Sequence, residues 1–328
     1  FVHEPLRLDI PSLRLVKILP PSDDGTIRCA IRHTTLDALS QDGAGFAYTC
    51  LSYVWGPSTP TRSILINGKS FKVRDNLWKF LRANSPPAFQ SFTDDDGKFH
   101  ELQVKSWFKS LWIDALSIDQ ESLLERNHQV QQMGRIYSCA ARVLSWMGDS
   151  PEIVSLLTFV QRHPGSRTSY WSDYSREQVP YLDDFCNNIY WKRAWVTQEV
   201  LLARTLFLQA QVIILPLKRV QKVIGRCIPY SGEYLGSEIR GLLSYLVLDT
   251  PSLRASSSLI ENVEMFCDKE CADIRDRIYS LISVSGDGSK IAVDYRCGPA
   301  KLAQGVFHTM KEDFCLKRVA LVFKTLQV

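Results

Sequence analysis

The feature that most constrains the fold is a pair of continuous apolar runs separated by a segment with helical spacing. The run "LWI" at 111–113 is unbroken, and "ARVLSWMG" at 141–148 has the same character. Between them, apolar residues of 123–140 recur at spacings of three, four and seven, which predicts a helix. Strands covered on both faces have continuous apolar runs, and no hairpin signal joins these two. The order strand, helix, strand therefore predicts a right-handed parallel crossover.

A third buried strand is predicted within "YTCLSYVWGPS" at 48–58, ended by a glycine and a proline. Tyr53 and Trp55 stand two residues apart, so their side chains point to one face of this strand. Both aromatics are consistent with ordinary core and with the walls of a pocket for a flat ligand. We expect central parallel strands near 49–54, 110–114 and 142–146, with helices on both faces.

The regions on either side of this core differ in character. Alternating and β-rich runs fill the first fifty residues, and a hairpin is predicted around Asn67-Gly68 in "SILINGKSFKV". Helical patterns dominate from about residue 217 onward. The sequence therefore predicts an α/β fold with an N-terminal β-rich extension and a C-terminal helical part. We divide it into a domain at 1–210 and a mainly helical extension at 211–328.

Composition excludes several classes of protein. Apolar residues make up 45% and charged residues 23% of the chain, which is ordinary for a globular protein. The net charge of +4 is dispersed without a basic stripe, and no apolar run is long enough to cross a bilayer. We therefore expect neither a nucleic-acid nor a membrane partner. The start lacks the layout of a signal peptide. We expect a cytoplasmic location.

The nine cysteines are odd in number and scattered, which favours free thiols over a disulfide framework. The closest pair, "CDKEC" at 267–271, has no second ligand pair nearby and is interpreted as two thiols on a helix. No metal site is predicted.

Six ordered segments resemble one protein family. They are "LSYVWG", "ILINGKSFKVRDNLWKFL", "LWIDALSIDQ", "ERNHQVQQMGRIYSCAARVLSWMG", "AWVTQEVLLA" and the trailing "DIRDRIYSL". Together they resemble the fungal heterokaryon-incompatibility (HET) domain, from about Tyr48 to Arg204. The resemblance implies a fungal origin and a role in non-self recognition that triggers cell death. Ser117 and Asp119 stand where the family usually has cysteine and asparagine, which excludes a catalytic cysteine at 117.

The HET domain in turn resembles TIR domains, some of which cleave NAD, and this implies a parallel-sheet core of the TIR or flavodoxin type. TIR domains have a Ser-Tyr pair at the end of their first strand, which Ser52 and Tyr53 match. Asp114 matches an aspartate at the end of the next strand. Trp195 and Glu199 match the Trp-to-Glu spacing of enzymatic members.

Hydrolysis of NAD needs one well-placed carboxylate. The nicotinamide leaves as a neutral molecule and requires no proton, whereas the ribosyl centre becomes oxocarbenium-like and is stabilised by a nearby negative charge. Glu199 is the candidate catalytic residue. The same residue is also consistent with a simple ion pair to Arg193 or Arg204 at a helix surface.

The remaining candidate site residues follow predicted strand ends, where ligands bind in open α/β sheets. We expect one cleft lined by Trp55, Gly56, Asp114 and Ser117, with Glu199 at its rim. The complete set predicted to bind NAD or a related nucleotide is Ser52, Tyr53, Trp55, Gly56, Asp114, Ser117 and Trp195. Asp114 and Asn76 also have local interpretations, as a backbone hydrogen-bond partner and a helix cap.

The sequence is consistent with three functions. The first is an NAD-cleaving cell-death effector, with NAD as substrate and no bound cofactor. The second is a non-enzymatic death-signalling module in which Glu199 is structural. The third is a biosynthetic enzyme on the same scaffold. We expect a homo-oligomer on activation.

Overall fold

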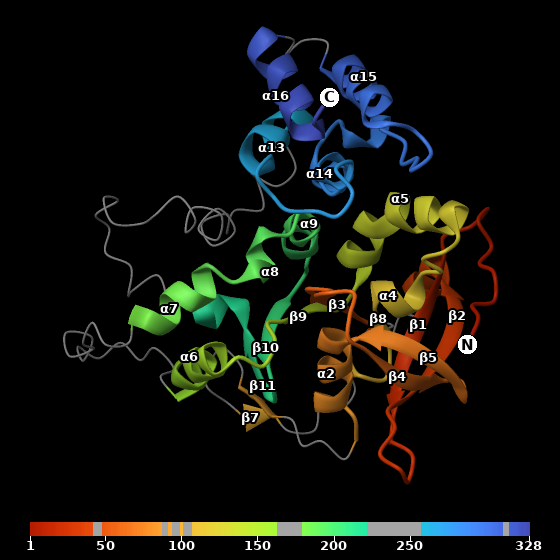
Figure 1. Ribbon diagram of the computed structural model, residues 1–328, viewed down its shortest axis with the longest axis vertical. Helices are drawn as coiled ribbons and strands as arrows, with labels where there is room; N and C mark the ends of the chain where they lie inside the picture. Colours follow the sequence, from red (N-terminus) through yellow and green to blue (C-terminus); the bar gives the residue numbers. More distant parts are fainter. Residues whose placement is uncertain are drawn as a thin grey trace.

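The computed structural model describes residues 1–41, 48–86, 91–93, 99–100, 107–162, 179–221, 257–310 and 315–328. Its centre is a mixed sheet with the strand order β5-β4-β2-β1-β8-β3-β9-β10-β11-β6-β7 (Figure 1). In the middle, β3 (Thr49–Tyr53) runs parallel to β8 (Leu111–Trp112) on one side and to β9 (Arg142–Trp146) on the other. The helix α5 (Leu123–Cys139) connects β8 to β9. The predicted parallel arrangement of these three strands is confirmed.

The N-terminal strands complete this same sheet, so they are not a separate extension. The strand β1 (Ser12–Leu19) lies antiparallel to β8 and pairs along its length with β2 (Arg28–Thr35). Beyond them, β4 (Thr61–Ile66) and β5 (Lys69–Arg74) form the predicted hairpin. Its two turn residues have positive φ, 50° at Asn67 and 79° at Gly68, as a type I′ turn requires.

The other side of the sheet also ends in antiparallel pairs. The strand β10 (Leu206–Ala210) is parallel to β9 and returns as β11 (Ile213–Pro216). Two short strands, β6 (Ser91–Thr93) and β7 (Phe99–His100), follow at the edge.

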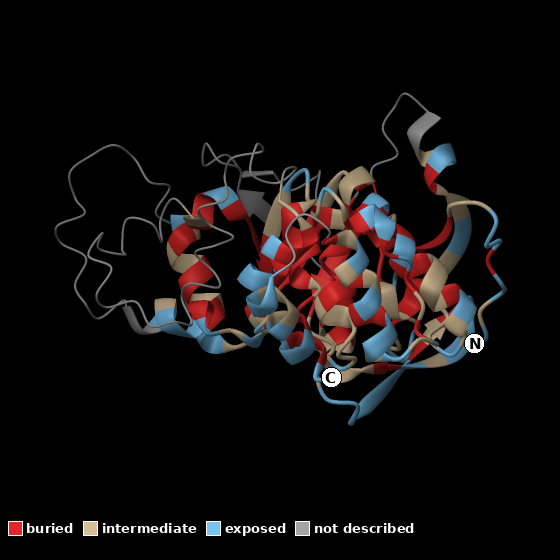
Figure 2. Ribbon diagram, turned by 90° about the horizontal axis from the view of Figure 1, so that it is seen from above, coloured by how far each residue is buried: buried red, intermediate tan, exposed pale blue. Residues whose placement is uncertain are grey.

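Successive residues of the central strands pack on opposite faces of the sheet. Cys50 belongs to the hydrophobic core on the α5 side, whereas Leu51 and Tyr53 belong to the core on the side of α2 (Asp75–Ala83). The helix α6 (Pro151–Arg162) covers the α5 side through Leu157 and Val160. Helices therefore cover both faces as predicted, and buried residues fill the middle of the molecule (Figure 2).

The sequence pattern of residues 181–204 predicts a helix through much of its length, but the structure divides residues 179–201 into three helices. These are α7 (Val179–Cys186), α8 (Ile189–Lys192) and α9 (Val196–Leu201). Asn188 caps α8 by accepting a hydrogen bond from the amide of Tyr190, which starts a new helix at this point.

The C-terminal part is helical, as expected, and gathers at one end of the molecule (Figure 1). Its helices are α13 (Leu259–Phe266), α14 (Asp276–Tyr279), α15 (Pro299–Thr309) and α16 (Leu316–Leu326). The helical patterns predicted within 222–256 lie outside the described residues. Because α13 ends at Phe266, the interpretation of Cys267 and Cys271 as thiols on one helix is wrong. The described cysteines are all free thiols.

Several contacts join the C-terminal part to the α/β core, among them two close backbone approaches. Gly134 of α5 lies so close to Ser283 that a Cβ at position 134 would stand 2.3 Å from the serine side chain. The backbone of Glu270 donates to the carbonyl of Lys192 and accepts from the amide of Ala194. The second contact places Glu270 beside the segment between α8 and α9. The division at 210/211 stays a prediction, although β10 and β11 pair across it. Within the described ranges, no helix combines the length and hydropathy that crossing a membrane requires.

Candidate functional site

A cavity of about 580 Å³ opens beyond the carboxyl ends of β3 and β8. The core contributes its strand-end residues and parts of α5 and α9, and the C-terminal part contributes the opposite wall. The residues of interest among its lining are Trp55, Gly56, Arg74, Asp114, Arg126, Arg193, Trp195, Glu199, Glu270, Asp273, Asp276 and Tyr295. Three of the four residues expected to share a cleft, Trp55, Gly56 and Asp114, therefore do so.

Glu199 is a buried carboxylate of this cavity. It lies on α9, whose residues are all buried, and its own exposure is 2%. The Ser52 hydroxyl donates a hydrogen bond to it, and the Tyr190 hydroxyl stands 2.7 Å from Ser52 Oγ and 2.6 Å from Ser145 Oγ. Burial raises the pKa of Glu199 above its usual value, while Arg193 and Ser52 act in the opposite direction. Glu199 thus lies deeper than the expected rim position.

Arg193 interacts electrostatically with two carboxylates, those of Glu199 and Asp114. Its Nη1 atom lies 3.5 Å from Glu199 Oε2 but makes no hydrogen bond within the described part of the chain. Burial acts to lower the pKa of Arg193, but the charges of Glu199 and Asp114 outweigh it and the net direction is upward. One guanidinium therefore faces two carboxylates, and its hydrogen-bonding capacity is not fully used. Arg204, the other proposed partner of Glu199, instead donates to the carbonyl of Ser138.

Asp114 connects the ends of the two central strands. Its Oδ2 accepts a hydrogen bond of 2.7 Å from Trp55 Nε1, and its Oδ1 accepts one of 2.7 Å from the amide of Ala115. Burial raises the pKa of Asp114, against the effect of Arg193. Asp114 therefore accepts a hydrogen bond from a backbone amide and also lines the cavity.

Aromatic side chains line two parts of the cavity. Trp55 and Trp195 are both partly exposed, and the guanidinium of Arg74 lies 5.1 Å from the Trp55 ring. Gly56 has φ of +74°, which side chains rarely allow, and its carbonyl accepts from Arg74 Nη1 at 2.6 Å. This glycine lets the chain turn away sharply at the end of β3, so Trp55 is left at the cavity edge as a flat wall.

The opposite wall comes from residues that the sequence did not identify. Asp276 accepts a hydrogen bond from the Tyr295 hydroxyl, and burial raises the pKa of Asp276 to about 6. Arg126 on α5 lies with its guanidinium 4.5 Å from the Tyr295 ring centre. The motif "DIRDRIYSL" was recognised and contains Asp273 and Asp276, but nothing local in it shows that it faces β3.

Several predicted residues lie outside the cavity wall. Ser117 is fully buried, and its Oγ accepts from the amide of Ile113, so the expectation that it lines the cleft is wrong. Ser52 and Tyr53 are also buried; Ser52 donates a hydrogen bond to Glu199, and Tyr53 acts to lower the pKa of Asp114. They support the cavity's carboxylates without facing its space.

Asn76 is not a helix cap. It lies inside α2, donates to the carbonyl of Val54 at 2.6 Å and accepts from Trp146 Nε1 at 2.9 Å. This side chain ties the ends of β3 and β9 to the helix.

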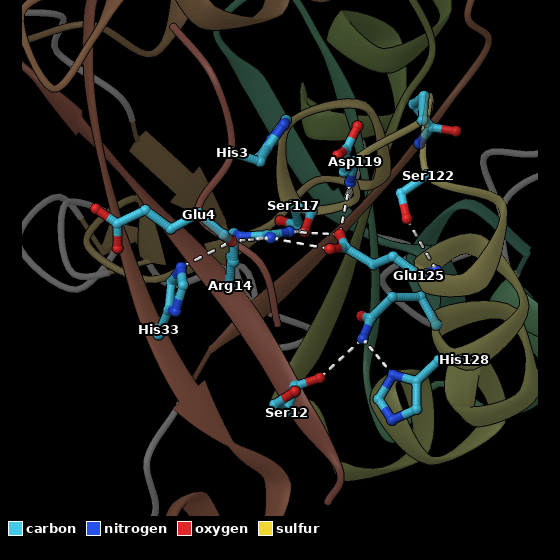
Figure 3. Close-up of polar contacts among 12 residues, drawn as sticks. His3, Glu4, Ser12, Arg14, His33, Ser117, Asp119, Ser122, Glu125 and His128 are labelled. Atoms are coloured by element: carbon cyan, nitrogen blue, oxygen red, sulfur yellow. Dashed lines mark hydrogen bonds and ion pairs between the residues drawn. The ribbon is translucent and has the colours of Figure 1, made fainter. Parts of the chain in front are cut away.

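A second buried ion pair supports the segment that contains Asp114. Arg14 of β1 donates from Nη1 to Glu125 Oε1 at 2.5 Å and from Nη2 to Glu125 Oε2 at 3.0 Å (Figure 3). Arg14 also donates to the carbonyl of Ser117, and Glu125 accepts from the amide of Asp119. These hydrogen bonds tie the middle of the segment between β8 and α5 to β1 and to the first turn of α5. The cap of α5 is Ser122, which accepts from the amide of Glu125.

Comparisons with known proteins agree with the family resemblance. Residues 48–199 match the family model described as heterokaryon incompatibility protein (HET). Over 121 residues, the chain is 34% identical to "Heterokaryon incompatibility protein 6, OR allele" of Neurospora crassa. That alignment covers 35% of this chain and 17% of the relative, so it spans much less than two thirds of that protein. No solved structure matches the chain.

Proposed function

We propose that this chain acts in fungal heterokaryon incompatibility, as an effector of the cell death that follows non-self recognition. The match of residues 48–199 to the HET family model and the similarity to the Neurospora crassa protein support this role. Homo-oligomerisation on activation and a cytoplasmic location are parts of the same proposal.

The chemistry we propose is cleavage of NAD at the bond between nicotinamide and ribose. The observation that carries it is the buried Glu199 carboxylate on the wall of a cavity that also presents Trp55 and Trp195. A volume of about 580 Å³ falls within the roughly 300–1,000 Å³ of small-molecule pockets. The two tryptophans provide flat apolar surfaces on which nicotinamide or adenine stacks.

The charges around Glu199 suit this reaction. When both carboxyl groups are ionised, Glu199 and Asp114 outnumber the single guanidinium of Arg193, and this part of the wall then has a net negative formal charge. Such a surface attracts the cationic nicotinamide ring and stabilises positive charge that develops at the ribosyl carbon. Fixed hydrogen bonds from Ser52 and Trp55 hold the two carboxylates in place before the substrate arrives.

The likeness to TIR domains belongs to this proposal. The residues behind it, Ser52, Asp114 and Glu199, all lie at or next to the cavity, although each also has a structural partner. The proposal does not depend on TIR ancestry, because the electrostatic argument rests on this chain's own residues.

A second candidate function is a non-enzymatic death-signalling module. The engagement of Glu199 by Ser52 and Arg193 favours this alternative, because a carboxylate held by two partners also fits a purely structural role.

Release of nicotinamide from NAD by purified protein tests the proposal. We expect wild type to turn over NAD and Glu199→Gln to lose about a hundredfold of that rate, as for one lost electrostatic stabiliser. The matched control is Glu152→Gln on the exposed side of α6, which should retain the wild-type rate.

All three proteins must show the same circular dichroism spectrum and melting temperature. Equal, nonzero rates for wild type and Glu199→Gln would remove Glu199 from the mechanism. No turnover by folded wild type at any concentration would contradict the enzymatic function and favour the signalling module.

A further inference from the structure

Arg126 differs from the other arginines of the cavity in having no polar partner. Arg74 donates to the carbonyl of Gly56, Arg193 lies 3.5 Å from Glu199, and Arg275 next to the cavity binds both oxygens of Asp273. The Arg126 guanidinium lies against the Tyr295 ring and makes no hydrogen bond or ion pair with any residue that the structure describes. Its five N–H donors are therefore available to a ligand.

The position of Arg126 is fixed by its neighbours in the chain. Glu125 is held by Arg14 and by the amide of Asp119, which secures the first turn of α5 (Figure 3). Asn127 accepts a hydrogen bond of 3.1 Å from the amide of Tyr295, so the ring that supports Arg126 is tied to the same helix. The backbone that carries Arg126 is therefore already ordered before a ligand binds the guanidinium.

The carboxylates near Arg126 have other partners. Asp273 is bound by Arg275, and Asp276 accepts from the Tyr295 hydroxyl. Their charges act on Arg126 from a distance, since neither forms an ion pair with it in the described structure. The guanidinium therefore offers an unused planar donor set to the cavity.

We propose that Arg126 binds the phosphate of a nucleotide in this cavity. A guanidinium donates two parallel hydrogen bonds to phosphate oxygens, which a carboxylate-rich wall cannot do. The identification of the nucleotide as NAD rests on the proposed function, and its pyrophosphate would then lie at Arg126 while the nicotinamide riboside lies at Glu199. Phosphate binding itself follows from Arg126 and does not require turnover.

Calorimetric titration with ADP, nicotinamide riboside and inorganic pyrophosphate tests this assignment. ADP carries phosphate, whereas nicotinamide riboside lacks it. We expect Arg126→Ala to weaken ADP binding about 10- to 100-fold, as for lost hydrogen bonds to a charged group, and to leave the affinity for nicotinamide riboside unchanged. Arg126→Lys should recover part of the loss, because it restores charge without the fork.

Arg135→Ala is the matched control, since Arg135 is an exposed arginine of the same helix that pairs with Asp37. Wild type should bind ADP more tightly than pyrophosphate. Equal ADP affinity for wild type and Arg126→Ala would overturn the proposal, and so would wild type that binds neither phosphate compound. Tighter binding of pyrophosphate than of ADP would overturn the nucleotide as the ligand.

The same titrations separate this inference from the proposed function. Wild type that binds ADP through Arg126 but leaves NAD intact would support the phosphate site and contradict the hydrolase. If NAD is turned over, Arg126→Ala should raise KM and leave kcat unchanged, because phosphate binding is equal in the ground and transition states.

Discussion

Two arginine–carboxylate clusters contact the segment between β8 and α5, and they differ in how completely their charges are matched. Arg14 meets one carboxylate, Glu125, and every donor direction of its guanidinium ends on a described acceptor. Arg193 faces both Glu199 and Asp114, and its Nη1 makes no hydrogen bond.

This difference in charge matching indicates that the Arg14 cluster stabilises the fold, whereas the Arg193 cluster is suited to bind a ligand. Arg14 and Glu125 are closed off from solvent, with exposures of 0% and 4%, and neither lines the cavity. The Arg193 cluster borders a cavity and carries one carboxylate more than its cation can neutralise. A matched pair fixes the backbone, whereas an unmatched one remains free to interact with a bound molecule.

The largest expected effect comes from breaking the matched pair. Glu125→Gln removes the charge that balances Arg14 and leaves the guanidinium buried without an ionic partner. We expect the free energy of unfolding to fall by about 3–5 kcal/mol, as measured by urea denaturation.

The same substitution at Glu199 is the control within this comparison. Glu199→Gln leaves Arg193 opposite Asp114, so the charges then balance, and the expected change in unfolding free energy is within about 1 kcal/mol. Equal losses at positions 125 and 199 would contradict the distinction between the two clusters.

A smaller effect is expected at Asp276, on the far wall of the cavity. Burial raises its pKa to about 6 from the ordinary value of 3.8, with Asp273 adding to the rise and Arg126, Tyr295 and Trp195 opposing it. Below pH 3.8 the protonated Asp276 side chain contributes its full stabilisation to the folded protein. That stability is lost as the pH rises through about 6, because the buried carboxyl must ionise.

Asp276→Asn stays neutral at every pH and keeps an oxygen for the Tyr295 hydroxyl. Relative to this variant, wild type should lose roughly 2 kcal/mol of unfolding free energy between pH 4 and pH 7.5. Urea denaturation of both proteins across that range measures the difference. Parallel pH profiles would show that Asp276 ionises without cost.

Local patterns in the sequence predicted the centre of the fold. Strands β3, β8 and β9 follow from continuous apolar runs, and the turn at Asn67-Gly68 follows from its residue types. The joining of β1 to β8 was not predicted, because pairing between distant strands leaves no local signal. The cap of α5 is Ser122 at the helix start, a residue type that favours this position.

The residues of the cavity were predicted only in part, because contacts between distant segments leave no local signal in the sequence. Trp55 and Asp114 follow strand ends, where a general rule places ligands, and Glu199 was found through its spacing from Trp195. Arg126 and Tyr295 come together through contacts between distant segments, among them the hydrogen bond from the Tyr295 amide to Asn127 and the packing of Gly134 against Ser283. Ser117 follows a strand end too, but its hydroxyl turns back to its own backbone.

A crystal structure of Glu199→Gln grown with NAD directly tests whether NAD binds in this cavity, because this variant should bind the dinucleotide without cleaving it. We predict intact NAD in the cavity, with its ribosyl carbon beside position 199 and its nicotinamide ring against Trp55 or Trp195. NAD bound elsewhere, or a cavity that stays empty at saturating NAD while the fold is unchanged, would contradict it.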